Sequence, residues 1–194
     1  MLFRSLLPAA VKHTLLKFRD TEHAPHLMFS GPAGTGKTTT ALTLNPDATI
    51  HRNGSDLTDA ELKSNAFHAG LSSGILFSDQ SRRKVVILDE ADALTERAQQ
   101  TLRATVEEFA THCWFVFVVN DRQKMIPPLR SRTFEMRFGF SEYANEMEDL
   151  MLGRCLEVLG KEHRTMSESA VRELVRIYAP DRSEEHTSEL QSRF

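Results

Sequence analysis

The sequence predicts an α/β fold in which a parallel sheet carries helices on both faces and a small helical domain begins after it. One observation is a glycine-rich segment at residues 31–38, which stands between a short apolar run and a helical pattern. Another is a pair of apolar runs, 85–88 and 114–119, without the polar alternation of half-exposed strands. Because helical patterns separate these runs, we expect strands that pair in parallel through crossover helices.

The composition is that of a globular protein. The 194 residues, 40% hydrophobic and 26% charged, suffice for one α/β domain and part of a second. No apolar run approaches the roughly 20 residues that span a bilayer, so we expect no membrane partner and a cytoplasmic location. A net charge of -3 argues against a wholly basic surface, yet allows a local basic track for nucleic acid. Cys113 and Cys155 have no metal-like spacing and are typical of reduced, buried thiols.

The elements at the amino end lead directly into the glycine-rich segment. Residues 1–19 lack acidic residues, as a transit peptide does, but their apolar side chains recur at near-helical spacing, which favours a helix of the domain itself. Residues 27–30 then form a short apolar strand, and residues 38–44 continue from the glycines as a helix. This is the strand, loop and helix that a phosphate-binding loop requires.

The glycine-rich segment matches the pattern Gly-x-x-x-x-Gly-Lys-Thr at every fixed position. Its glycines let successive backbone N–H groups point at phosphate oxygens. Lys37 supplies a charge for the β- and γ-phosphates of a bound triphosphate, and the Thr38 hydroxyl is placed to ligate Mg²⁺. The predicted nucleotide-binding residues are Gly31, Pro32, Ala33, Gly34, Thr35, Gly36, Lys37, Thr38 and Thr39.

The stretch that follows contains two predicted elements and a loop. Pro46 ends the preceding helix, and residues 48–52 form a short strand. A turn at 53–56 supplies Ser55 or Asp56 as the cap of a helix over residues 58–68. Residues 69–81 are small and polar around a short element at 75–77, which predicts a surface loop.

Polar side chains follow both of the fully apolar strands. Asp89 and Glu90 end the first, where Asp89 can orient Mg²⁺ and Glu90 can polarise an attacking water. Adjacent acids are common by chance, but their position after a buried strand and downstream of the phosphate loop is specific. A helix is expected at 95–110, and Asn120 ends the next strand. Its amide could hold that water, or Asn120 could merely start a turn.

The pattern changes from Pro127 onward. Residues 127–132 predict a turn and a short helix, and the alternation at 134–138 predicts an edge strand. Two helices, 141–159 and 167–178, then begin a helical domain. Taken alone, Arg132 in this region is typical of a solvated surface arginine.

Four segments together resemble the AAA+ ATPase subunit of sliding-clamp loaders. They are 89–95, 98–103, 128–132 and the Asn-Gly-Ser-Asp turn at 53–56, and the nearest likeness is to the large subunit of T-even-type phage loaders. The resemblance covers most of residues 5–181. It implies a P-loop NTPase (AAA+) fold with ATP and Mg²⁺ as cofactors. It identifies Lys37 and Thr38 as the Walker A pair, Asp89 and Glu90 as Walker B, Asn120 as sensor 1, and Arg132 as an arginine finger acting in trans.

This resemblance implies a motor subunit that hydrolyses ATP. Its partners would be the other subunits of a ring-like hetero-oligomer, the sliding clamp, and primer-template DNA held through phosphates without sequence readout. Basic candidates for DNA contact are Lys63, Arg82, Arg83, Lys84 and Arg103. Arg103 is the best of them, whereas 82–84 fit a solvated strand entry better. Such a subunit would work in the cytoplasm of a phage-infected bacterial cell.

Two alternatives remain open. One is another AAA+ machine, such as a helicase loader or a branch-migration motor. The other is a fragment that binds nucleotide without turnover. A DEAD-box helicase would carry Ser-Ala-Thr after the next strand, where this chain has Val118-Val119-Asn120.

The chain departs from the clamp-loader pattern in three places. Thr133 replaces the cysteine of the Ser-Arg-Cys motif, and the Lys-Tyr-Arg-Pro element near the adenine is absent. Residues 182–192 resemble a translated sequencing adapter, so Arg182 is not expected to serve as the sensor 2 arginine. We therefore expect an ATPase core at 1–139 that lacks the amino-terminal part of the family's core, a partial helical lid at 140–181, and a non-native tail at 182–194.

Overall fold

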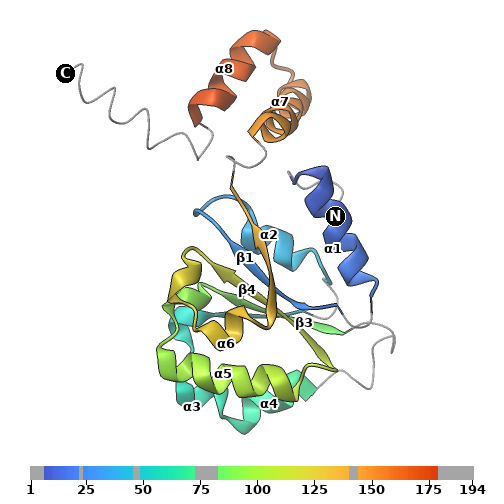
Figure 1. Cartoon of the computed structure of the whole chain (residues 1–194). Coiled ribbons are helices and arrows are strands. Elements are labelled where there is room, and N and C mark those ends of the chain that lie inside the picture. The colour runs from blue at the N-terminus through green and yellow to red at the C-terminus, as the bar shows by residue number, and fades with distance from the viewer. Residues whose placement is uncertain (1–6, 22–23, 46–48, 73–82, 140–143, 179–194) are drawn as a thin grey trace, which may run out of the picture.

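A five-stranded parallel sheet forms the centre of the molecule, with strand order β2-β3-β4-β1-β5. The computed structural model describes residues 7–21, 24–45, 49–72, 83–139 and 144–178. The strands are β1 (His26–Ser30), β2 (Thr49–Asn53), β3 (Lys84–Asp89), β4 (Cys113–Val119) and β5 (Thr133–Arg137). The predicted α/β fold with a parallel sheet is confirmed, and β5 lies at the edge as expected (Figure 1).

Helices cover both faces of this sheet. They are α1 (Ala9–Arg19), α2 (Lys37–Leu42), α3 (Asp59–Leu62), α4 (Asn65–Ser72), α5 (Glu96–Glu108) and α6 (Pro127–Arg130). Because successive strand residues point to opposite faces, each inner strand contributes to two separate cores. Val86 and Phe115 pack in the cluster that contains Leu102 of α5. Ile87 and Val116 pack in the other, with Leu15 of α1.

The register of the strands determines which residues meet at the carboxyl edge. In parallel pairs all strands end at the same edge. Ser30 at the end of β1 pairs with Val119 at the end of β4, and Leu88 of β3 pairs with Phe117. The loop after β1, the acids after β3 and the asparagine after β4 therefore lie at one edge of the sheet.

The helix predicted over residues 58–68 is two helices, α3 and α4. The cap of α3 is Thr58, and neither Ser55 nor Asp56 serves as that cap. The Thr58 hydroxyl accepts from the backbone N–H of Glu61, whose carboxylate accepts from the Thr58 N–H. The Ser64 hydroxyl then accepts from the N–H of Phe67 in the first turn of α4, which begins at Asn65. The element expected at 75–77 lies outside the described residues.

Two helices follow the sheet, as predicted. Helices α7 (Ala144–Lys161) and α8 (Glu168–Tyr178) pack through Leu152, Val171 and Val175. Glu146 of α7 accepts a hydrogen bond of 2.7 Å from the backbone N–H of Ala9, the first residue of α1. The boundaries of the core, lid and tail stay predictions. The predicted tail, Arg182 included, lies outside the described residues, and among those described no helix is long and apolar enough to cross a membrane.

Candidate nucleotide-binding site

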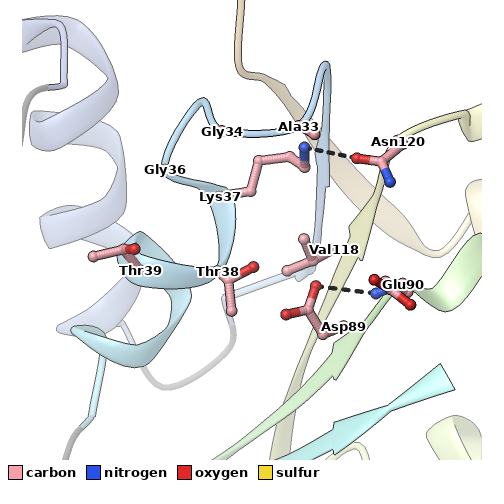
Figure 2. A pocket seen from close by; sticks show the side chains of 10 residues that line it. All are labelled: Ala33, Gly34, Gly36, Lys37, Thr38, Thr39, Asp89, Glu90, Val118 and Asn120. Atoms are coloured by element: carbon pink, nitrogen blue, oxygen red, sulfur yellow. Dashed lines mark hydrogen bonds between the residues drawn. The ribbon is translucent and has the colours of Figure 1, made fainter. Parts of the chain in front are cut away.

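A cleft of about 310 Å³ opens at the carboxyl edge of the sheet, beside the loop after β1. The loop, the end of β3 and the end of β4 contribute its walls (Figure 2). Its lining residues are Ala33, Gly34, Gly36, Lys37, Thr38, Thr39, Asp89, Glu90, Val118 and Asn120. The structure thus brings together six of the nine predicted loop residues, the two acids and the asparagine that the sequence singled out, whereas Gly31, Pro32 and Thr35 are not among the lining residues. Arg132 is not among the lining residues.

The loop needs glycine for its backbone and for its packing. Gly31, Gly34 and Gly36 have φ values of 143°, 80° and 85°, which side chains of the L form rarely adopt. Gly31 also lies against the end of β5, where an added Cβ would meet the Phe138 carbonyl oxygen at 1.8 Å. The loop is therefore held between the core and the strand that follows Arg132.

Lys37 is the most enclosed charged residue of the cleft, with only 6% of its surface exposed. Its Nζ donates to the carbonyl oxygens of Gly31 at 2.7 Å and Pro32 at 2.6 Å. It also donates to Asn120 Oδ1 at 3.0 Å, the bond drawn in Figure 2. Burial lowers the pKa of Lys37, while the nearby carboxylates of Asp89 and Asp92 act to raise it. The ammonium group is thus directed into the loop by contacts from both sides of the cleft.

The two acids at the end of β3 differ in geometry. Asp89 Oδ1 accepts from the backbone N–H of Glu90 at 3.0 Å, and Asp89 Oδ2 lies 3.5 Å from Nε2 of His51 on β2. Glu90 has the left-handed backbone φ of 49° and ψ of 39° and an exposed side chain. Its carbonyl oxygen would lie 2.6 Å from a Cβ added at Gly54. Sequence reasoning missed His51 because nothing in the chain indicates that β2 pairs with β3.

The oxygen atoms near the loop fit Mg²⁺. The Thr38 hydroxyl and the Asp89 carboxylate approach each other across the cleft in Figure 2. Among the described residues no group of three or more His, Cys, Asp or Glu could hold a metal alone. Mg²⁺ is commonly held by one or two protein oxygens together with nucleotide phosphates and waters. The donor set is therefore suited to Mg²⁺ that arrives with a nucleotide.

The Asn120 side chain lines the cleft, and the next residue, Asp121, forms the turn after β4. The side chain of Asp121 accepts from the N–H of Gln123 and caps the short 3₁₀ helix η5 (Arg122–Lys124). The Asn120 amide instead lines the cleft and accepts from Lys37. The turn alternative is therefore not supported at Asn120, and its role toward water stays a prediction.

Arg132 lies at the opposite edge of the sheet. It immediately precedes β5, whose Thr133 pairs with His26 at the start of β1, whereas Arg137 pairs with Ser30 beside the loop. Five strand residues at roughly 3.3 Å each span about 16 Å. Arg132 Nη1 donates to the Pro128 carbonyl at 2.8 Å, and its Nη2 lies 2.6 Å from Glu107 Oε1.

The basic candidates for DNA contact have different surroundings. Lys63 pairs with Asp59 at 2.9 Å, and Arg103 pairs with Glu107 at 3.4 Å; both side chains remain partly exposed. Arg83 donates to the Ala24 carbonyl at 2.7 Å and lies over the ring of Trp114, and Lys84 donates to the Gly70 carbonyl at 2.8 Å. Arg83 and Lys84 are thus half-buried structural residues, which differs from the solvated strand entry expected. Arg82 lies outside the described residues.

Comparisons with known proteins agree with this geometry. The model of the family "ATPase family associated with various cellular activities (AAA)" matches residues 27–142. The replication factor C small subunit of Picrophilus torridus is 40% identical over 136 residues, which are 65% of this chain and 42% of that protein. Replication factor C subunit 5 of Mus musculus is 33% identical over 177 residues, 87% of this chain and 50% of that protein. This chain spans about half the length of the curated relatives it matches.

Solved structures share the fold at low identity. RuvB from Thermotoga maritima superposes with a TM-score of 0.66 at 18% identity, covering 89% of this chain and 59% of that one. A DNA polymerase III gamma subunit-related protein from the same organism gives a TM-score of 0.56 at 15% identity, covering 84% and 57%. At these identities the likeness concerns the fold alone.

Proposed function

The chain belongs to the ATPase family associated with various cellular activities, and from this membership we propose that it is an ATP-hydrolysing subunit of a sliding-clamp loader. The observation that supports this most directly is the single cleft that joins Lys37, Glu90 and Asn120. Relatives named replication factor C small subunit support the assignment within the family. The Asn-Gly-Ser-Asp turn at 53–56 and the segments at 89–95 and 128–132 support it through their resemblance to clamp loaders.

In this proposal each residue of the cleft has a separate task. Lys37 and the backbone N–H groups of the loop bind the phosphates of ATP. Thr38 and Asp89 hold Mg²⁺, which neutralises charge on the phosphate oxygens when bound. Glu90 polarises the attacking water, and Asn120 orients that water beside the γ-phosphate.

Arg132 acts, in this proposal, on the nucleotide of a neighbouring subunit. Its position at the amino end of β5 places it about 16 Å along the strand from the loop of its own chain. A side chain fixed at that edge, with contacts to Pro128 and Glu107, does not serve the cleft of the same chain. A cation supplied in trans to the developing charge of phosphoryl transfer is a known way to complete such a site.

The wider context is part of the same proposal. We propose that the partners are other loader subunits, the clamp, and primer-template DNA contacted through phosphates, with Arg103 and Lys63 as the exposed candidates. We also propose a phage source and action in the cytoplasm of the infected cell, on the resemblance to T-even-type loaders.

The nucleotide site is tested by binding alone. Fluorescent ATP and ADP analogues should bind the wild-type chain with Mg²⁺, and Lys37→Ala should weaken binding at least about tenfold, because a charge-assisted phosphate contact is lost. Lys124→Ala is the matched control, since this exposed lysine lies in η5 outside the cleft. Equal affinity of Lys37→Ala and wild type would contradict the proposal.

The trans assignment is tested by mixing two inactive variants. Arg132→Ala keeps its cleft, and Lys37→Ala keeps its Arg132, so a mixture can form sites in which one chain supplies each part. We expect ATP turnover by the mixture that neither variant shows alone. A mixture as inactive as its components, under conditions where wild type hydrolyses ATP, would refute the role of Arg132.

A further inference from the structure

Glu107 joins two arginines that come from different parts of the chain. It is the second-last residue of α5, and its Oε1 lies 2.6 Å from Nη2 of Arg132 and 3.4 Å from Nε of Arg103. Arg103 stands one helical turn before it on α5, and its Nε attracts the Glu107 carboxylate by charge without a hydrogen bond. Arg132 reaches the same oxygen from the short segment between α6 and β5.

The contacts of Arg132 fix more than its position. Its Nη1 donates to the Pro128 carbonyl at 2.8 Å, while Nη2 meets Glu107. The two terminal nitrogens of the guanidinium are thus held by two different helices, which defines the plane of the group as well as its location. The side chain remains 39% exposed, so it is held in place without being buried.

A surface ion pair of this kind contributes little to folding. Exposed pairs add little to the free energy of unfolding, because the Coulomb gain is offset by the lost freedom of two long side chains. At a reaction site this ordering of the side chain is useful, because a reacting group must be held within about 0.5 Å of its productive position. An arginine ordered in advance loses less rotamer freedom when it meets its target.

We infer that Glu107 is a positioning residue that holds the Arg132 guanidinium in the orientation in which a neighbouring subunit's nucleotide meets it. The inference rests on the proposed function for its catalytic consequence, but the ordering of Arg132 by Glu107 is a property of the single chain.

The ordering is measured by NMR on the whole chain labelled with ¹⁵N-arginine. The guanidinium signals of Arg132 are assigned by their loss in Arg132→Lys, and their proton exchange with solvent is then compared between variants. We expect exchange at least about fivefold faster in Glu107→Gln and partial restoration in Glu107→Asp, which retains the carboxylate on a shorter stem. Glu108→Gln is the matched control, since it removes the same charge from the next residue and should leave the exchange unchanged. Exchange in Glu107→Gln equal to that of wild type would overturn the inference.

The catalytic consequence is measured in the mixing assay. The acceptor is Arg132→Ala, and the donor is Lys37→Ala with either Glu107 or Gln at position 107. At saturating ATP we expect the donor with Gln to support about threefold to tenfold slower turnover, with the KM for ATP of the acceptor unchanged, because the acceptor's own cleft is intact.

The outcomes separate the two proposals. A donor with Glu107 that fails to rescue the acceptor contradicts the proposed trans site and removes the catalytic consequence, while the NMR comparison still decides the ordering. Rescue that is equally fast with Glu107 and with Gln overturns the inference on Glu107 and leaves the trans site standing.

Discussion

The backbone of Glu90 is unusual for a residue with a side chain. Its φ of 49° and ψ of 39° place it in the left-handed region, which is a few per cent of non-glycine residues, and it directly follows the buried strand β3. Strained residues of this kind persist where the surrounding structure holds them, as the close approach of Gly54 to the Glu90 carbonyl does. The sharp turn directs the chain out of the sheet at the residue whose carboxylate, in the proposed function, polarises the attacking water.

Replacing this carboxylate tests its chemical role. Glu90→Gln should retain ATP affinity within about twofold and lower ATP turnover by roughly 10²–10⁴-fold, because the amide cannot accept a proton from water. Turnover is measured at protein concentrations at which the wild type hydrolyses ATP, with the exposed Glu173→Gln as control. Undiminished turnover would refute the assignment of Glu90.

A second residue-scale prediction concerns pH and lies away from the cleft. His26 is buried at the start of β1, and its Nδ1 accepts from the backbone N–H of Phe115 at 3.2 Å. Burial, and then the charge of Arg83, lower the pKa of His26 from 6.5 to about 4. Between these values the unfolded chain binds the proton and the folded chain does not, so stability is complete above pH 6.5 and is lost as the pH falls toward 4.

We therefore expect proton uptake by His26 in the unfolded chain to lower the free energy of unfolding by about 2 kcal/mol when the pH falls from 7.5 to 5. Urea unfolding at a series of pH values measures this slope. In His26→Gln the slope over that range should be shallower, whatever the absolute stability of the variant. His13→Gln, at an exposed position of α1, serves as control. An identical slope in His26→Gln and wild type would exclude His26 as its origin.

At the scale of elements, one buried amide connects α5 to the segment that leads to Arg132. Gln99 is 2% exposed. Its Nε2 donates to the carbonyls of Leu94 at 3.1 Å and Lys124 at 3.0 Å, and its Oε1 accepts from the N–H of Ile126 at 2.8 Å. The helix and the connection between β4 and α6 are thus fixed to each other by two hydrogen bonds of one side chain, and a third joins that side chain to Leu94 just before α5.

Removing that amide should destabilise the fold. Gln99→Leu leaves buried backbone groups of Lys124 and Ile126 without their partner, which should lower the free energy of unfolding by about 2–4 kcal/mol in urea titrations. Gln100→Leu, on the exposed side of the same helix, should change it by less than about 0.5 kcal/mol. Equal effects of the two substitutions would show that the hydrogen bonds of Gln99 do not carry this stability.

Elements with a strong local pattern could be predicted from the sequence. The run from Val85 to Leu88 predicts a buried strand because every residue is apolar. The glycine pattern of the loop predicts phosphate binding, because glycines let backbone N–H groups point at phosphate oxygens. The prediction of Ser55 or Asp56 as the helix cap was wrong although Thr58 and Glu61 form a recognisable capping box at the start of α3. The role of Gln99 could not be seen, because a glutamine in a helical pattern looks the same whether it faces solvent or the core.

At the scale of the whole molecule, strand order decides what sequence reasoning can reach. The sequence could place three residues in one site, because each lies at or after the carboxyl end of a predicted parallel strand: Asp89, Asn120 and Lys37. The contacts of His51 with Asp89 and of Arg132 with Glu107 depend on which elements are neighbours in space. Those neighbours are set by the order β2-β3-β4-β1-β5, which no local pattern specifies.

A prediction at this scale follows from the separation of the cleft and Arg132. If each active site needs two chains, ATP turnover per chain should fall on dilution once the chains separate, and it should become negligible in a monomeric preparation. Turnover measured against protein concentration, with the association state followed by light scattering, tests this. Constant turnover per chain down to the monomer would show that a single chain completes its own site.

The placement of the loop and Arg132 at opposite edges of one sheet gives the subunit a direction. Under the proposed function each chain offers an acceptor face and a donor face, so copies join head to tail and not through a shared twofold axis. An open arc of n such subunits contains n − 1 complete sites, and only closure into a full ring adds the last one. A chain at one end of an arc then needs only its arginine, and a chain at the other end needs only its cleft, so the two terminal positions tolerate the loss of different halves of the machinery.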